Sequence, residues 1–258
     1  MAQAVRSDAA YPVLLERYGR DIRENPQDYL KRVDRAFLML EQRDIGKPNS
    51  EDIDTLLSHP EWRNEGSRLK AMRLHLQGRF DEAKLLIQQN IRGDIHVQEQ
   101  ARLLADIELS RKDTSAAMDA YRVAWEHGRD ETDYIDLLDM HCGRGEPPEE
   151  LLQKGLGLYP RSPGAIQSIF EVYFAAGDSA SLKKSGEISD RAENTLWPLS
   201  VDWKIRHARV LISLKRWREA EAVLMAALEV LDDDARLKGP DSEVIRKQIF
   251  TLLEASRK

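Results

Sequence analysis

Hydrophobic residues recur along this chain with the spacing of one face of an α-helix. The first such stripe contains Tyr11, Leu14, Leu15, Tyr18 and Ile22, and the second contains Leu30, Val33, Phe37 and Leu40. Between the stripes, we expect Asn25 to cap the second helix and Pro26 to be its first residue. Ser50 is expected to cap a short third helix, which ends at Pro60.

Three later stretches nearly repeat one another: LQGRFDEA (76–83), SRKDTSAA (110–117) and SLKRWREA (213–220). The final alanines of the first two lie 34 residues apart, and the third follows about three such steps later. Twelve positions before these alanines stand Ala71, Ala105 and Ala208. Two antiparallel helices cross most closely where both carry a small residue. The period therefore predicts stacked helix–turn–helix units.

The spacing resembles the unit of the tetratricopeptide repeat (TPR) family, which has a small residue at position eight, glycine and an aromatic residue at the turn, and alanine at position twenty. In the first clear unit these roles fall on Ala71, Gly78, Phe80 and Ala83. Two units are degenerate, because Leu151 and Leu182 stand where the pattern has alanine. The resemblance covers roughly residues 63–231.

The resemblance implies an all-α fold, a right-handed α-solenoid of antiparallel helix hairpins (a TPR-like superhelix) with N-terminal helices and a C-terminal capping helix. We expect an N-terminal helical segment at 1–60, a repeat array of about five units, two of them degenerate, at 61–231, and the capping helix at 232–258. Asp241 is expected to cap that last helix.

Composition and charge narrow the range of partners. Hydrophobic residues make up 41% and charged residues 33% of the chain, a profile that fits a soluble helical protein. The net charge is −6, so no global positive field attracts nucleic acid or anionic lipid. Residues 126–150 hold nine acidic residues, and residues 202–218 hold six lysines and arginines. These two stretches are either solvated helix faces or an acidic and a basic docking patch.

The sequence leaves two cellular compartments open. Cys142 is the single cysteine, so no disulfide forms within the chain, and a cytoplasmic location is the simplest expectation. The first residues lack the apolar core of a signal peptide, and no run approaches the length of a membrane span. If a leader was removed, a periplasmic or envelope-associated location is the alternative.

Motifs that carry catalytic chemistry are missing from the sequence. It contains no phosphate loop, no dinucleotide-binding glycine fingerprint, no His-Glu-x-x-His and no paired Cys-x-x-Cys. His141 and Cys142 could offer two metal ligands, but adjacent helical residues point about 100° apart and no second pair is visible. We therefore expect no cofactor, no metal and no enzyme activity.

The resemblance places ligand contacts on the first helix of each unit, which lines the concave face. Arg68 and Arg102 occupy matching positions in adjacent units, and paired guanidinium groups recognise carboxylates or phosphates. Alternatively, each pairs with a nearby acid such as Glu65 or Asp106. The family's carboxylate clamp is not matched. The predicted partner-binding groove consists of Arg68, Met72, His75, Arg102, Asp106 and Arg209.

The function expected from these features is a non-catalytic scaffold or adaptor that binds a peptide or a partner subunit in a macromolecular assembly. Two alternatives stay open: an enzyme or accessory subunit with a site that no motif reveals, and nucleic-acid binding through the basic stretch 204–218. Self-association is possible, because exposed repeat ends can stack.

Overall fold

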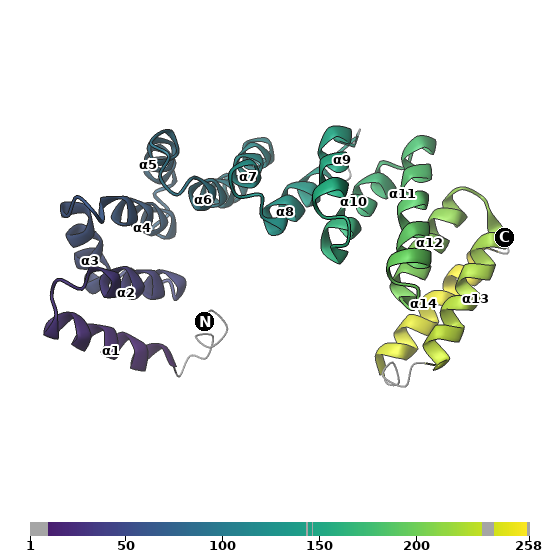
Figure 1. Cartoon of the computed structure of the whole chain (residues 1–258), viewed down its shortest axis with the longest axis horizontal. Coiled ribbons are helices and arrows are strands. Elements are labelled where there is room, and N and C mark those ends of the chain that lie inside the picture. The colour runs from purple at the N-terminus through teal and green to yellow at the C-terminus, as the bar shows by residue number, and fades with distance from the viewer. Residues whose placement is uncertain (1–9, 143, 146, 234–239, 257–258) are drawn as a thin grey trace. The chain divides into compact units, whose positions relative to one another are not determined.

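The computed structural model describes residues 10–142, 144–145, 147–233 and 240–256, which are helical over most of their length (Figure 1). The elements are α1 (Ala10–Glu24), α2 (Tyr29–Glu41), α3 (Lys47–Ser58), α4 (Arg63–Leu76), α5 (Phe80–Arg92), α6 (Val97–Ser110), α7 (Thr114–Gly128), α8 (Glu131–His141), α9 (Glu149–Leu158), α10 (Pro163–Ala176), α11 (Ser179–Arg191), the π-helical turn η2 (Ala192–Leu196), α12 (Val201–Ser213), α13 (Trp217–Asp233) and α14 (Pro240–Ser256). No strand occurs among the described residues, and the predicted all-α fold is confirmed.

The helices pair as hairpins within two compact units that divide between Asp133 and Tyr134. In the first unit α2 packs on α3, α4 on α5 and α6 on α7, and the first helices also touch, α2 with α4 and α4 with α6. In the second unit α10 packs on α11 and α12 on α13, while α14 contacts both α12 and α13. This stacking confirms the predicted solenoid arrangement within each unit.

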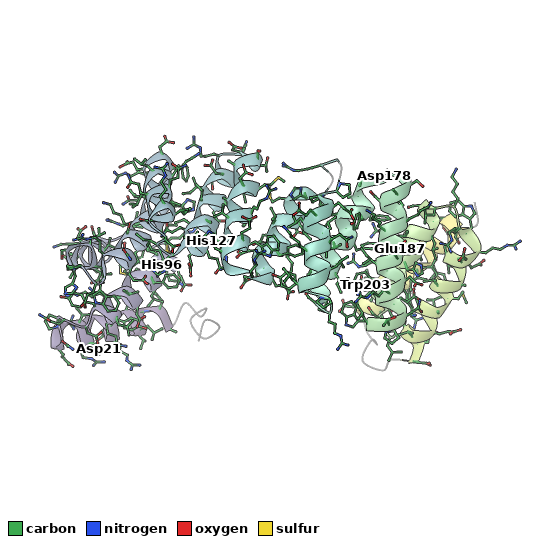
Figure 2. All side chains as sticks on the ribbon, turned by 45° about the horizontal axis from the view of Figure 1, so that its top comes forward. Asp21, His96, His127, Asp178, Glu187 and Trp203 are labelled. Atoms are coloured by element: carbon green, nitrogen blue, oxygen red, sulfur yellow. The ribbon has the colours of Figure 1, made fainter. Side chains whose placement is uncertain are left out.

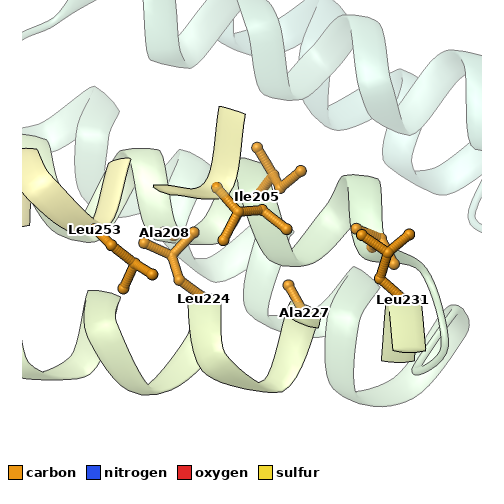
Figure 3. Close-up of a cluster of buried hydrophobic side chains, with 8 residues drawn as sticks. Ile205, Ala208, Leu224, Ala227, Leu231 and Leu253 are labelled. Atoms are coloured by element: carbon orange, nitrogen blue, oxygen red, sulfur yellow. The ribbon is translucent and has the colours of Figure 1, made fainter. Parts of the chain in front are cut away.

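Small residues lie where the hairpins cross, as the repeat spacing predicts. Ala71, Ala83, Ala105, Ala117, Ala208 and Ala220 are all 0% exposed. In the second unit, Ala208 of α12, Leu224 of α13 and Leu253 of α14 share one buried apolar cluster (Figure 3). The last helix therefore covers the end of this unit's core, the role expected of a capping helix.

The two degenerate hairpins use other small residues than the sequence pattern suggests. In α9 the small residue is the buried Gly155, four positions after Leu151, and the ring of Tyr134 fills the space beside it. In α11 the small buried residues are Ser181, Ser185 and Ser189, one helical turn apart. The helices α10 and α11 still pack on each other, and Tyr134 packs on Gly155, but an alanine search does not detect these small residues.

Three predicted helix starts are wrong. α2 begins at Tyr29 instead of Pro26, because the Asp28 carboxylate accepts a hydrogen bond from the Lys31 amide (3.1 Å) and caps the helix. α3 begins at Lys47, before Ser50, with Gly46 in the capping position. α14 begins at Pro240, so that Asp241 lies inside the first turn. Each error is local and leaves the order of the helices unchanged.

The division into segments 1–60, 61–231 and 232–258 stays a prediction. Within the first unit, α2 and α3 form a hairpin whose first helix contacts α4, just as α4 contacts α6. The hairpin geometry therefore continues toward the N-terminus beyond the residues that match the repeat pattern.

Candidate partner-binding surface

In the first unit, side chains from successive first helices meet on one face. The guanidinium carbon of Arg68 in α4 lies 5.6 Å from the centroid of the Phe37 ring in α2. Arg68 Nε also donates a hydrogen bond to Glu65 Oε2 at 3.0 Å, and its Nη1 lies 3.9 Å from Met72 Sδ. Arg68 is thus fixed between an aromatic ring, a carboxylate and a thioether.

The same face continues from α4 to α6 through Glu65. His96 Nε2 lies 3.0 Å from Glu65 Oε1, and His96 precedes the first residue of α6 with a left-handed φ of 43° (Figure 2). The Glu65 carboxylate therefore contacts Arg68 on its own helix and His96 on the next hairpin. Side-chain contacts join α2, α4 and α6 on one face of the first unit, and we name this face the first-unit groove after the groove predicted from the sequence.

Arg102 of α6 has its own carboxylate partners. Its Nε donates to Asp133 Oδ1, and its Nη2 lies 3.4 Å from Asp130 Oδ1. The hydrogen bond that Arg102 donates to Asp133, whose side chain is 0% exposed, raises the pKa of Arg102. Arg68 and Arg102 are thus paired separately, and the acid beside Arg102 is Asp133 rather than the expected Asp106.

His75 of α4 and Asp106 of α6 influence each other across adjacent hairpins. Burial lowers the pKa of His75 below its ordinary value of 6.5, the Asp106 carboxylate opposes this, and Arg43 lowers it further. The side chain of Asp106 remains accessible to water, yet the surrounding protein raises its pKa through desolvation. His75 Nδ1 is buried without a hydrogen-bond partner among the described residues, which favours the neutral imidazole.

The six predicted groove residues fall into the two units. Arg68, Met72, His75, Arg102 and Asp106 belong to the first unit, where Arg68 contacts Met72 and His75 interacts with Asp106. Arg209 belongs to the second unit, where its guanidinium carbon lies 4.7 Å from the centroid of the Phe174 ring. These are placements only, and the binding role of the six residues stays a prediction.

The first helices of the second unit carry an aromatic cluster. The rings of Trp197 and Trp203 stack with centroids 5.7 Å apart, and Trp203 meets Phe170 edge-on at 5.8 Å. Trp203 is 5% exposed, so it belongs to the core (Figure 2). Arg206 lies over both Phe170 and Trp203 and forms ion pairs with Glu171 and Asp202.

Arg206 and Phe174 are partly buried residues of the first helices that the sequence pattern did not single out. Counting back from the repeat alanines gives Ile205 as the counterpart of Arg68, but Ile205 is 5% exposed and packs into the core of α12, α13 and α14. Arg206, one position later, takes the outward place. A strict 34-residue count fails here, and a search for arginine within one position of the expected place would have found it.

The basic stretch 202–218 is not a continuous positive surface. Lys204 is buried and its Nζ lies 3.0 Å from Glu193 Oε1, Arg206 is paired as described, and Arg216 binds Glu219 at 2.6 Å. The acidic stretch is also partly neutralised, since Glu149 Oε2 lies 2.6 Å from Lys184 Nζ. The interpretation as helix faces with local ion pairs is favoured over two docking patches.

A pocket of about 470 Å³ in the second unit holds the groups most relevant to an enzyme alternative. Hydrogen bonding to Lys184 lowers the pKa of Glu149, while burial and a hydrogen bond to Glu149 raise the pKa of Tyr173. Tyr173 Oη donates to Glu149 Oε2 at 2.8 Å. Both shifts move the pKa values of Glu149 and Tyr173 away from neutral pH, which is opposite to the tuning expected of a general acid or base.

The described residues contain neither a cluster of metal ligands nor a helix that could span a membrane. No group of three or more His, Cys, Asp or Glu side chains there could hold a metal ion. Cys142 is exposed, and burial of its sulfur together with Glu171 and Asp139 raises the pKa of its thiol. None of the described helices combines the length and the apolar character needed to cross a bilayer.

Comparisons with known proteins bear on the fold alone. No family profile and no curated protein matches the chain. Among solved structures, the TPR2AB domain of yeast Sti1 in complex with an Hsp90 peptide aligns with 14% identity and a TM-score of 0.36, over 89% of this chain and 98% of that one. The Cut9–Hcn1 hetero-tetramer of the APC/C aligns with 14% identity and a TM-score of 0.41, over 95% of this chain and 49% of that one.

Similarity at this level transfers no activity and no partner. The hairpins themselves, with buried alanines at the predicted crossings and first helices in contact, confirm that the fold is TPR-like.

Proposed function

We propose that this protein is a non-catalytic scaffold that binds a protein or peptide segment in the first-unit groove. The observation that carries the proposal is the continuity of the groove. Arg68 reaches Phe37 on the preceding hairpin, and Glu65 reaches His96 on the following one. Side chains held in this way form a rigid surface, which lowers the entropy lost on binding.

The groove offers chemically mixed contacts to a partner. Met72 supplies a polarisable apolar side chain, His75 a neutral imidazole, and Asp106 a carboxylate with no ion pair among the described residues. A face of this kind suits a helix or an extended segment that carries both apolar and charged residues. We expect a partner subunit in a cytoplasmic assembly, and both the compartment and self-association stay predictions.

The test exchanges charges in the groove without disturbing the fold. Asp133 is fully buried beside Arg102, so reversing the charge of Arg102 would damage the hairpin as well as the surface. The better variant is Arg68→Gln combined with Asp106→Lys. Affinity purification from native extract, followed by quantitative mass spectrometry, should show that partners held by the wild type are reduced about tenfold or more.

The matched control carries the same two changes on α7, a second helix. Arg122 and Asp119 are both exposed, and Arg122→Gln with Asp119→Lys should retain the wild-type partners. Helical circular dichroism and melting temperature should be nearly equal in the two variants. Equal recovery of partners by the groove variant and the control would refute the groove as the binding surface.

A further inference from the structure

Three arginines of the first helices lie over phenylalanine rings of the preceding first helix. Such stacking holds the planar guanidinium group in one orientation and shields one of its faces from water. The pairs, with the distance from guanidinium carbon to ring centroid, are Arg68–Phe37 (5.6 Å), Arg206–Phe170 (5.7 Å) and Arg209–Phe174 (4.7 Å).

In two of these three stacks, the arginine also binds a carboxylate side chain of the protein. Glu65 accepts a hydrogen bond from Arg68 at 3.0 Å. Arg206 bonds to Glu171 of α10 and, through its Nε at 2.9 Å, to Asp202 on its own helix. The side chains of Arg68 and Arg206 are 16% and 12% exposed, so each is packed as well as paired.

Arg209 has the same stack and no such partner. It lies closest of the three to its ring, and no carboxylate among the described residues is within ion-pair distance of its guanidinium group. Its backbone carbonyl accepts a hydrogen bond from Ser213, while its guanidinium group donates none to the residues that the structure describes. A guanidinium that is oriented by a ring and partly shielded from water binds a carboxylate more strongly than a freely solvated one.

We propose that Arg209 and Phe174, both in the second unit, form an anchor for the carboxylate side chain of a Glu or Asp residue in a bound protein segment. This inference rests on the proposed scaffold function and adds the chemistry of one contact. A side-chain carboxylate is favoured over a chain terminus because Glu and Asp side chains complete the two other stacks. The occupant is therefore an internal acidic residue of a protein segment that lies across α10 and α12.

The probe is a library of short peptides that are acetylated and amidated, so that only side chains carry charge. Each Glu-containing sequence is paired with its Gln twin. Fluorescence anisotropy should show binders in which the Glu member binds about tenfold more tightly than its twin, the difference expected for one charge-assisted hydrogen bond. In Arg209→Gln this difference should vanish, and Arg209→Lys should keep only part of it, because lysine lacks the planar fork.

Arg218→Gln is the matched control, since it removes the same charge from an exposed arginine on α13 and should leave the preference intact. NMR of the arginine Nε–H groups supplies a direct readout, because the Arg209 signal should shift on addition of the Glu peptide and not of its twin. The proposal is overturned if the Glu preference is absent, if it survives in Arg209→Gln, or if peptides whose only carboxylate is a free C-terminus are the Arg209-dependent binders.

The experiments distinguish failure of the proposed Arg209 anchor from failure of the proposed scaffold function. If no protein is retained from native extract by the wild type, the scaffold function fails. If partners are retained equally by the wild type and by Arg209→Gln, only the acidic anchor fails.

Discussion

At the scale of single residues, the smallest side chains have the largest structural consequence. Gly155 in α9 faces the buried ring of Tyr134, whose hydroxyl donates a hydrogen bond to the Leu151 carbonyl at 3.2 Å. A Cβ atom at Gly155 would lie 1.9 Å from that hydroxyl oxygen, whereas a Cβ at Gly157 would meet nothing within 4 Å. A side chain at Gly155 would therefore clash with Tyr134, whereas at Gly157 a side chain would only restrict the freedom of the backbone.

We expect Gly155→Ala to destabilise the protein by about 1–3 kcal/mol, because a buried ring must move to admit the methyl group. Gly157→Ala, in the same helix, should be neutral or stabilising by up to about 1 kcal/mol, because alanine favours helix and limits the unfolded chain. Urea unfolding of the two variants measures the contrast. Equal stabilities would mean that Tyr134 does not pack on Gly155.

His75 gives a pH dependence whose sign follows from its lowered pKa. The unfolded chain takes up this proton near the ordinary value of 6.5, while the folded protein does so only at lower pH. The free energy of unfolding should therefore decrease as the pH falls below 6.5, down to the folded-state pKa. His75→Gln should reduce this decrease, as measured by urea unfolding between pH 7.5 and about 5.

The control for His75 is His127→Gln, because His127 is exposed on α7 (Figure 2). In that variant, the free energy of unfolding should decrease between pH 7.5 and about 5 by as much as it does in the wild type. A decrease in His75→Gln as large as that in the wild type would contradict the assignment of this proton to His75.

At the scale of elements, one buried carboxylate joins α2 to α3. Asp52 of α3 is 0% exposed and binds two arginines of α2, Arg32 at 3.0 Å and Arg35 at 2.6 Å. Arg35 makes a second bond to the same carboxylate through its Nη2 at 2.8 Å. The two guanidinium groups are largely buried. The cluster therefore stabilises the hairpin of α2 and α3 only if the Asp52 carboxylate balances their charge.

Asp52→Asn should destabilise the protein by about 3 kcal/mol or more, since removing one partner leaves buried charge uncompensated. Asp54→Asn, an exposed position on the same helix, should change stability by less than about 0.5 kcal/mol. Thermal unfolding followed by circular dichroism compares the two. If both variants melt like the wild type, the cluster contributes nothing to the hairpin.

At the scale of the whole molecule, charge is arranged in local pairs. The acidic and basic stretches that stand out in the sequence are partly neutralised within each unit, as Glu149 is by Lys184 and Lys204 by Glu193. The nucleic-acid alternative loses its main support for this reason, because buried or paired cations cannot release counterions from a phosphate backbone. Among the described residues, Asp106 and Arg209 of the first helices form no such ion pair, and they are the groups that the proposed binding would use.

The sequence by itself determined the helical hairpins and their crossings. Helical periodicity and the recurrence of small residues act over one or two turns, so they can be read along the chain, and Ala71, Ala83, Ala208 and Ala220 are buried as predicted. The caps at Asp28 and Gly46 were missed because several polar or glycine residues near each helix start could serve equally well.

Only the tertiary structure decided which side chains face outward together and which carboxylate each arginine meets. A shift of one residue turns a helical side chain by about 100°, and in α12 the arginine that stacks on the preceding first helix is Arg206, one position after the buried Ile205. The pairing of Arg102 with Asp133 and the lack of a partner for Arg209 depend on how helices rotate against one another. That rotation is set by packing across hairpins, which no local pattern in the chain encodes.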